Sequence, residues 1–101
     1  MKNLIVLSDI KKFRQIYESF GTPEAFEIFV TEAQMLDLKP WLGDAFLVEL
    51  STQRENSNLT EWNKKALYGG DYTYEGEIYF NEGIRGALAY YAYARFLNAG
   101  G

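Results

Sequence analysis

The 101-residue chain contains no cysteine and no histidine. Without cysteine it can form no disulfide and has no thiol nucleophile, and without either residue type it cannot build the common structural zinc sites. The lack of histidine also excludes every catalytic mechanism that needs an imidazole base. Much of nucleophilic and metal-dependent enzyme chemistry is therefore excluded, and we expect no cofactor.

Long apolar runs are also missing. The run from Leu4 to Leu7 is shorter than the hydrophobic part of a signal peptide, and no small-residue cleavage site follows it. The charge-free stretch 86–94 ends at Arg95, well short of the roughly 20 apolar residues of a membrane-spanning helix. The sequence thus predicts a protein that is not secreted and has no membrane partner.

Positive charge is scarce relative to negative charge. The chain has 10 lysine and arginine residues against 14 aspartate and glutamate residues, which gives a formal net charge of -4. Because the field of such a molecule repels polyanions, we expect no sequence-specific binding of nucleic acid.

The apolar and aromatic residues are sufficient for one folded domain over residues 1–101. Hydrophobic residues make up 48% of the chain and charged residues 24%, which is ordinary for a globular domain. Aromatic residues reach 17%, and tyrosine and tryptophan suit surfaces that are half buried and half solvated. The composition therefore favours a protein that makes contacts with other proteins.

Helical periodicity dominates the chain. Apolar residues recur every three or four positions, and signals such as Gly21 (stop) and Thr22-Pro23 (start) separate the periodic segments. Pro40 is expected to bend or restart the chain before Trp41. The sequence predicts a mainly α fold, a small bundle of about five helices at residues 10–20, 23–37, 41–51, 61–68 and 82–98.

Two segments between the helices have a different character. Residues 51–58 are polar and contain no apolar anchor, so we expect a mobile loop there. Residues 72–74 and 78–80 favour β-structure and flank the turn Glu75-Gly76-Glu77. A short β-hairpin is therefore predicted before the last helix.

Two helices have features that bear on contacts. The second helix has only a thin polar stripe, so the rest of its surface requires cover from protein. The last helix is expected to be capped by Asn81, and Gly83 and Gly86 near its start are expected to admit another backbone closely. The polar stripe of the second helix consists of Glu24, Glu27, Thr31 and Gln34.

The densest acidic cluster, around the hairpin, is the only candidate for chemistry. Neighbouring carboxylates can bind Ca²⁺ or act as an acid and base pair. The spacing lacks the features of a calcium-binding loop, and acids beside a turn are usually only solvated. We therefore predict no metal site and no catalytic residue at the members of this cluster, Asp71, Glu75, Glu77 and Glu82.

Tyrosines supply the candidate contact residues. Tyrosines can stack on bases, but no basic track accompanies them here. Two interpretations remain open, in which these rings fill a small core or form a protein-binding patch. The candidate interface residues are Tyr72, Tyr74, Tyr79, Tyr90 and Tyr93.

Two stretches resemble a known family. The segment MLDLKPWLGDAF (residues 35–46), preceded by Glu32-Ala33-Gln34, and the segment LYGGDYTYEGEIYFNEGIRGALAYYAYARFL (residues 67–97) are similar to head-to-tail connector, or head-completion, proteins encoded by Bacteroidales phages and prophages. The resemblance covers roughly two-thirds of the chain, and neither stretch is a catalytic signature.

The resemblance implies a structural role. Proteins of this class are helical and form a ring under the portal vertex that joins the capsid to the tail, so the implied partners are other copies of the chain, the portal protein and a tail or stopper protein. The implied location is the virion, or the host bacterial cytoplasm during assembly. The family usually continues past the position of Gly101 with a further segment.

The resemblance also implies roles for individual residues. It implies a helix corner at Leu38, Trp41, Leu42 and Gly43, and a last core helix containing Tyr91, Ala94, Arg95 and Phe96.

Three hypotheses follow. The leading one is a phage connector subunit without enzymatic activity. The second is a soluble protein- or peptide-binding regulatory module that uses the same aromatic patch and has no virion role. The third is a small hydrolase that depends on Glu75 or Glu77, which ranks last because so short a chain has few residues to spare for a deep cleft.

Overall fold

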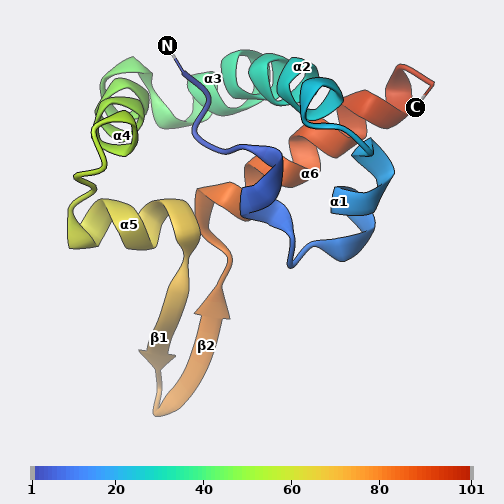
Figure 1. Cartoon of the computed structure of the whole chain (residues 1–101). Helices are drawn as coiled ribbons and strands as arrows, with labels where there is room; N and C mark the ends of the chain where they lie inside the picture. The colour runs from blue at the N-terminus through green and yellow to red at the C-terminus, as the bar shows by residue number, and fades with distance from the viewer. Residues whose placement is uncertain (1, 101) are drawn as a thin grey trace.

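The computed structural model describes residues 2–100, and the side chains of Tyr72, Tyr79 and Phe80 lie outside the described set. Within these residues it has five helices, counting the continuous α2–η2–α3 as one, and a hairpin before the last helix (Figure 1). The predicted mainly α fold is therefore confirmed. The elements are η1 (Leu7–Ile10), α1 (Arg14–Phe20), α2 (Pro23–Ala33), η2 (Gln34–Leu38), α3 (Lys39–Leu42), α4 (Asp44–Glu55), α5 (Glu61–Tyr68), β1 (Gly70–Tyr74), β2 (Glu77–Asn81) and α6 (Gly83–Asn98).

The first helix starts later than the sequence predicts. Ile10 closes the separate 3₁₀ turn η1, in which the Asp9 carboxylate accepts the Val6 N–H at 2.8 Å. Phe13 has non-helical dihedrals (φ -90°, ψ 66°), so α1 begins only at Arg14. The apolar periodicity from Ile10 to Phe20 thus spans two short elements rather than one helix.

Of the bend or restart predicted before Trp41, the restart is wrong, because the helix continues through Pro40. The helix runs from α2 through the π-helical turn η2 into α3, and the Lys39 N–H donates to the Gln34 carbonyl five residues earlier. Proline has no backbone N–H to donate, and its ring crowds the carbonyl of the preceding turn. A π turn is wider than an α-helical turn and therefore leaves room for the ring. The break lies instead at Gly43 (φ 86°, ψ 154°), a conformation that glycine adopts far more readily than other residues.

The predicted mobile loop 51–58 is also wrong in its first half, because α4 continues to Glu55. Ser51 is buried, and its hydroxyl donates to the Lys2 carbonyl at 3.1 Å. Arg54 forms an ion pair with Asp9 at 2.9 Å. Both contacts reach the N-terminal segment, which the local sequence around Ser51 does not reveal.

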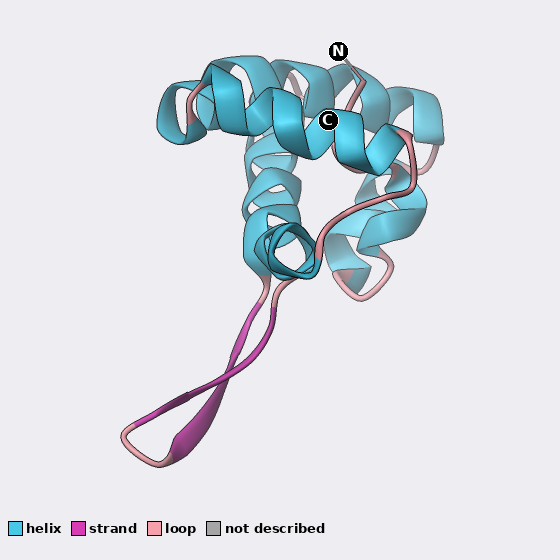
Figure 2. Cartoon of the chain, turned by 90° about the vertical axis from the view of Figure 1, so that its left-hand side faces the viewer, coloured by secondary structure: helices cyan, strands magenta, loops and turns pink. Residues whose placement is uncertain are grey.

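The core is centred where α2 and α6 pack side by side (Figures 1 and 2). Residues 4–10, α1, η2, α4 and α5 also contribute buried side chains to it. Leu4 and Ile5 are fully buried, so the N-terminal segment is part of the core. Edge-to-face and tilted aromatic contacts join α1, α2 and α6, with ring centroids 4.7 to 6.4 Å apart. The rings are Phe20, Phe26, Phe29, Tyr93 and Phe96.

The hairpin projects away from the helices (Figures 1 and 2). Its strands are antiparallel, and Tyr74 pairs with Glu77 beside the turn. Glu75 and Gly76 both have positive φ (51° and 82°), which defines a two-residue type I′ turn. The register continues without a bulge to the pair Gly70 and Asn81.

The base of the hairpin is closely packed at two glycines. A Cβ atom on Gly69 would collide with the Asn81 carbonyl, and one on Gly83 would lie 2.5 Å from the Gly69 nitrogen. The predicted close approach of another backbone at Gly83 is confirmed. Asn81 also accepts the Gly83 N–H at 2.6 Å, in line with its predicted capping role, although Glu82 occupies the N-cap position itself.

Candidate protein-interaction surface

The hairpin arm, defined as residues 70–81, is exposed over most of its described residues. Every described side chain from Asp71 to Ile78 is exposed, and the exposed fractions of Tyr74 and Ile78 are 62% and 74%. A two-stranded hairpin is only marginally stable in water without a further packed layer. The arm therefore presents apolar side chains and backbone that no other part of the described chain covers.

A hollow of about 300 Å³ lies where the arm leaves the helices. Trp62 of α5 forms one wall and is 79% exposed. Lys65 and Asp71 also line it, so the hollow combines an aromatic ring with both signs of charge. Exposed tryptophans of this kind are frequent anchors in protein interfaces.

The candidate interface tyrosines do not form a single patch. Tyr74 lies on the arm, whereas Tyr90 and Tyr93 lie on α6. Tyr90 is 62% exposed, with its ring edge-to-face on Phe13, while Tyr93 is partly buried against the core, 6.4 Å from Phe20. Tyr72 and Tyr79 pair in the strand register, but their side chains lie outside the described set.

The corner implied by the resemblance is present between α3 and α4. Leu38 is buried, Leu42 packs against the core, and Gly43 makes the turn. Trp41, however, is 71% exposed and points away from the core. Trp41 thus contributes surface rather than packing.

On α6, the four residues implied by the resemblance divide into two pairs. Tyr91 and Ala94 are exposed, while Phe96 packs against the core with its ring 4.7 Å from Phe20. Arg95 donates two hydrogen bonds to Asp37 of η2, at 2.7 and 3.0 Å, and Glu32 lies 3.8 Å away.

The Arg95 contacts have an electrostatic consequence. The hydrogen bonds to Asp37 raise the pKa of the Arg95 guanidinium above its ordinary value, partial burial opposes this, and the charges of Asp37 and Glu32 add to it. Arg95 therefore stays cationic and ties α6 to the π turn.

A second apolar surface lies on the outer side of the α2–η2–α3 helix. The sequence predicts that protein covers most of this helix, and the rest of the chain covers only part of it. The polar stripe was predicted wrongly at Gln34, which is only 1% exposed. Its side-chain oxygen accepts the Leu4 N–H at 2.8 Å, so the N-terminal segment covers that side. The exposed residues of this surface are Ile28, Met35 and Leu36, which share one helix face, while Trp41 is exposed elsewhere on the helix.

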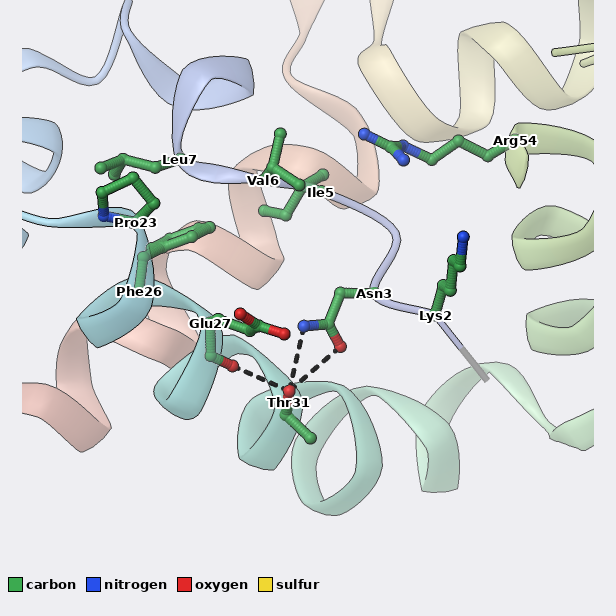
Figure 3. A pocket seen from close by; sticks show the side chains of 10 residues that line it. All are labelled: Lys2, Asn3, Ile5, Val6, Leu7, Pro23, Phe26, Glu27, Thr31 and Arg54. Carbon is green, nitrogen blue, oxygen red and sulfur yellow. Dashed lines mark hydrogen bonds between the residues drawn. The ribbon is translucent and has the colours of Figure 1, made fainter. Parts of the chain in front are cut away.

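A groove of about 460 Å³ lies between the N-terminal segment and the start of α2 (Figure 3). Asn3 and Thr31 hydrogen-bond to each other along one side, with oxygen to nitrogen and oxygen to oxygen distances of 3.0 and 3.2 Å. Lys2, Glu27 and Arg54 contribute charged groups. Its apolar lining consists of Ile5, Val6, Leu7, Pro23 and Phe26.

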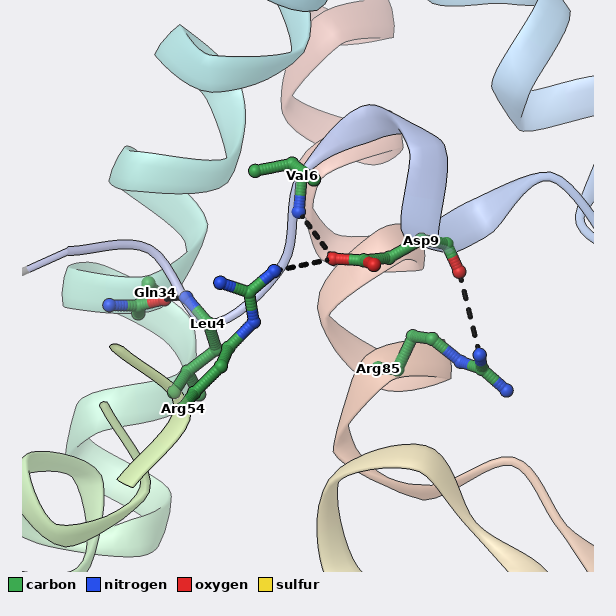
Figure 4. Close-up of polar contacts among 6 residues, drawn as sticks. All are labelled: Leu4, Val6, Asp9, Gln34, Arg54 and Arg85. Atoms are coloured by element: carbon green, nitrogen blue, oxygen red, sulfur yellow. Dashed lines mark hydrogen bonds and ion pairs between the residues drawn. The ribbon is translucent and has the colours of Figure 1, made fainter. Parts of the chain in front are cut away.

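Of the charged groups beside this groove, Arg54 stabilises the fold (Figure 4). Arg54 and the Val6 N–H share one oxygen of the Asp9 carboxylate. Arg85 donates to the backbone carbonyls of Asp9 and Tyr68, and its guanidinium lies 5.3 Å from the centre of the Tyr68 ring. These contacts join the N-terminal segment, α4 and α6.

The acidic cluster is spread over the arm and its base. Glu75 and Glu77 lie at the exposed tip, Asp71 lines the hollow, and Glu82 forms an ion pair with Lys12 at 2.7 Å. Among residues 2–100, no group of three or more metal-ligating side chains is placed to hold an ion. None of the helices in that range is long and apolar enough to cross a membrane.

Comparison with known proteins places the chain in one family. Residues 38–101 match the family of unknown function DUF6712, which covers more than half of the sequence, and the chain belongs to this family. The match includes the Gly43 corner, the arm and α6. No curated protein and no solved structure matches the chain.

Proposed function

We propose that the chain is a structural phage protein, a subunit of the head-to-tail connector that joins capsid to tail at the portal vertex. In this role it acts without enzymatic activity or cofactor. Its partners are other copies of itself in a ring, the portal protein and a tail or stopper protein. It functions in the virion, and in the host cytoplasm during assembly.

The observation that carries this proposal is the projecting hairpin arm. An arm whose described side chains from Asp71 to Ile78 are all exposed offers a ready contact for another protein. The segments that resemble connector proteins, residues 35–46 and 67–97, contain the Gly43 corner, the arm and α6.

A second support is that two different apolar surfaces exist on the chain. One is the arm, and the other is the outer side of the α2–η2–α3 helix with Ile28 and Leu36. Contacts between two different surfaces of identical subunits generate rings when the rotation closes. A connector requires this kind of association.

The first test is genomic. A portal or capsid gene upstream of this gene, with tail genes downstream in the same orientation, supports the proposal and identifies the portal protein to use. Unrelated metabolic or regulatory neighbours would contradict it.

The second test is assembly with that portal protein, observed by sedimentation and electron microscopy. The double variant Tyr74→Ser/Ile78→Ser should lose ring formation on the portal while it keeps the helical circular dichroism of the parent. Val48→Ser, which removes an exposed apolar side chain of α4, is the matched control and should assemble normally. Equal assembly of both variants would show that the arm is not the contact.

The second candidate function is a peptide-binding regulatory module, and the groove of Figure 3 favours it. Its volume of about 460 Å³ is within the range of ligand sites, roughly 300–1,000 Å³. Val6→Glu would place a charge in the apolar lining. If the chain binds a cellular peptide that this variant releases, and no portal protein, the module is the better description.

A further inference from the structure

Both strands of the arm have an open edge. In the described chain the sheet has two strands, so each strand has a partner on one side only. In an antiparallel ladder, alternate residues direct their N–H and C=O groups away from the partner strand. Since the turn closes on Tyr74 and Glu77, this alternation places the outward groups on Thr73 in β1 and Ile78 in β2.

The edges lack several of the devices that usually prevent strand addition, although the arm does carry charged side chains. Proteins protect open edges with proline, lysine, bulges or a covering element. Residues 70–81 contain no proline, lysine or arginine, and the register has no bulge. Thr73, Tyr74 and Ile78 are exposed residue types that favour strands. The arm is therefore a suitable acceptor for a further strand.

The charge of the arm limits which strand can be added. Residues 70–81 carry Asp71, Glu75 and Glu77 and no cationic side chain. Strands in a sheet lie about 4.8 Å apart, and like charges placed opposite each other are destabilising. A second acidic arm is thus a poor partner, whereas lysine or arginine on the incoming strand is favoured.

We propose that the hairpin arm binds an extended basic segment of a partner protein by strand addition, with lysine or arginine alternating with apolar residues. Tyr74 and Glu77 share one face of the arm, and Asp71 and Ile78 share the other. The apolar side chains of the segment therefore contact Tyr74 while its cationic side chains face Asp71, or they contact Ile78 while the cationic ones face Glu77. The backbone hydrogen bonds form at the edge of Thr73 or of Ile78. The inference rests on the proposed connector function for one point only, which is that the segment belongs to a virion protein.

The test uses the full chain and a short capped peptide of alternating lysine and valine, with binding followed by NMR titration. The same peptide with an N-methyl group on every residue keeps its charge but can donate no backbone hydrogen bond at either of its edges. We expect the N-methylated peptide to bind about tenfold more weakly or worse, and the equivalent glutamate–valine peptide not to bind. Equal affinity for the two lysine peptides, or no binding of the first, would overturn the proposal.

Variants of the protein identify which of the two strand edges, that of β1 or that of β2, binds the peptide. Thr73→Pro and Ile78→Pro each remove one outward N–H group, and proline is tolerated at such edge positions. One of them should abolish peptide binding, while Thr73→Val and Ile78→Val, which keep the N–H groups, should retain it. If instead the chain dimerises through the arm and Thr73→Pro abolishes the dimer, the occupant is a second copy and the proposal is wrong. The portal protein is not used in this assay. A negative result would therefore contradict strand addition by the arm but not the connector function, which has a separate test.

Discussion

Replacing Gly69 with alanine tests whether the base of the arm is as closely packed as its geometry indicates. Gly69 has φ 80° and ψ -167°, a region that is essentially restricted to glycine, and a side chain there costs roughly 1–3 kcal/mol. The added Cβ would also collide with the Asn81 carbonyl, which is backbone and cannot simply rotate away. We therefore expect Gly69→Ala to lower the free energy of unfolding by about 3 kcal/mol or more.

Gly76→Ala is the matched control. Gly76 has nearly the same φ, 82°, but a Cβ there would meet nothing within 4 Å. Its cost is the backbone penalty alone, about 1–2 kcal/mol. Thermal unfolding followed by circular dichroism measures the difference, because each 1 kcal/mol shifts the Tm of a domain of this size by roughly 4–8 °C.

Gly69→Ala should thus unfold at least about 4 °C below Gly76→Ala. If the two variants unfold at the same temperature, the strands do not meet closely at Gly69. The direction in which the arm leaves the helices would then depend on other contacts.

Three further substitutions test the rest of the structure. Gln34→Leu leaves the buried Leu4 N–H without its acceptor, and urea unfolding should show a loss of about 1–3 kcal/mol; Thr31→Val, at an exposed position, should lose less. Phe20→Ala removes the ring at the centre of the aromatic cluster and should cost about 3–5 kcal/mol in the same assay. Trp62→Ala should change stability by less than about 0.5 kcal/mol, because the ring is exposed; a larger loss would show that Trp62 packs against the fold.

Local sequence signals predicted the elements whose stabilising contacts are also local. Thr22 before Pro23 marks the start of α2, and the Thr22 hydroxyl accepts the Ala25 N–H. Thr60 does the same for α5, where it accepts the Asn63 N–H. The hairpin was predictable because Gly76 allows the turn and the flanking residues favour strands.

The errors occur where a distant segment determines the local conformation. Residues 51–55 look like a loop in isolation, but Ser51 and Arg54 bind Lys2 and Asp9, more than 40 residues earlier. Gln34 is polar by type and buried because it holds the backbone of Leu4. Pro40 is a helix breaker only when the preceding turn is α-helical, and the sequence alone did not predict a π turn.

The candidate surface was predictable in part. The sequence identifies Tyr74 as a candidate contact residue from its type. It cannot distinguish Tyr74 from Tyr93, whose ring packs against Phe20 in the structure. Trp62 and Ile78 were missed as contact residues because an exposed apolar residue and a buried one look the same in sequence. The signal available for Ile78 was its position in a hairpin with too few residues to cover both faces.

The buried N-terminal segment has a consequence for how the chain is made. Residues 2–7 leave the ribosome well before their partners, since the hydroxyl that binds the Lys2 carbonyl belongs to a residue 49 positions later. At a synthesis rate of about 5–20 residues per second, that partner is translated roughly 2 to 10 seconds afterwards. During this interval the part of the core that α4 contributes is missing, so Leu4, Ile5 and Leu7 are incompletely buried. A nascent chain of this protein is therefore a natural client for a ribosome-associated chaperone.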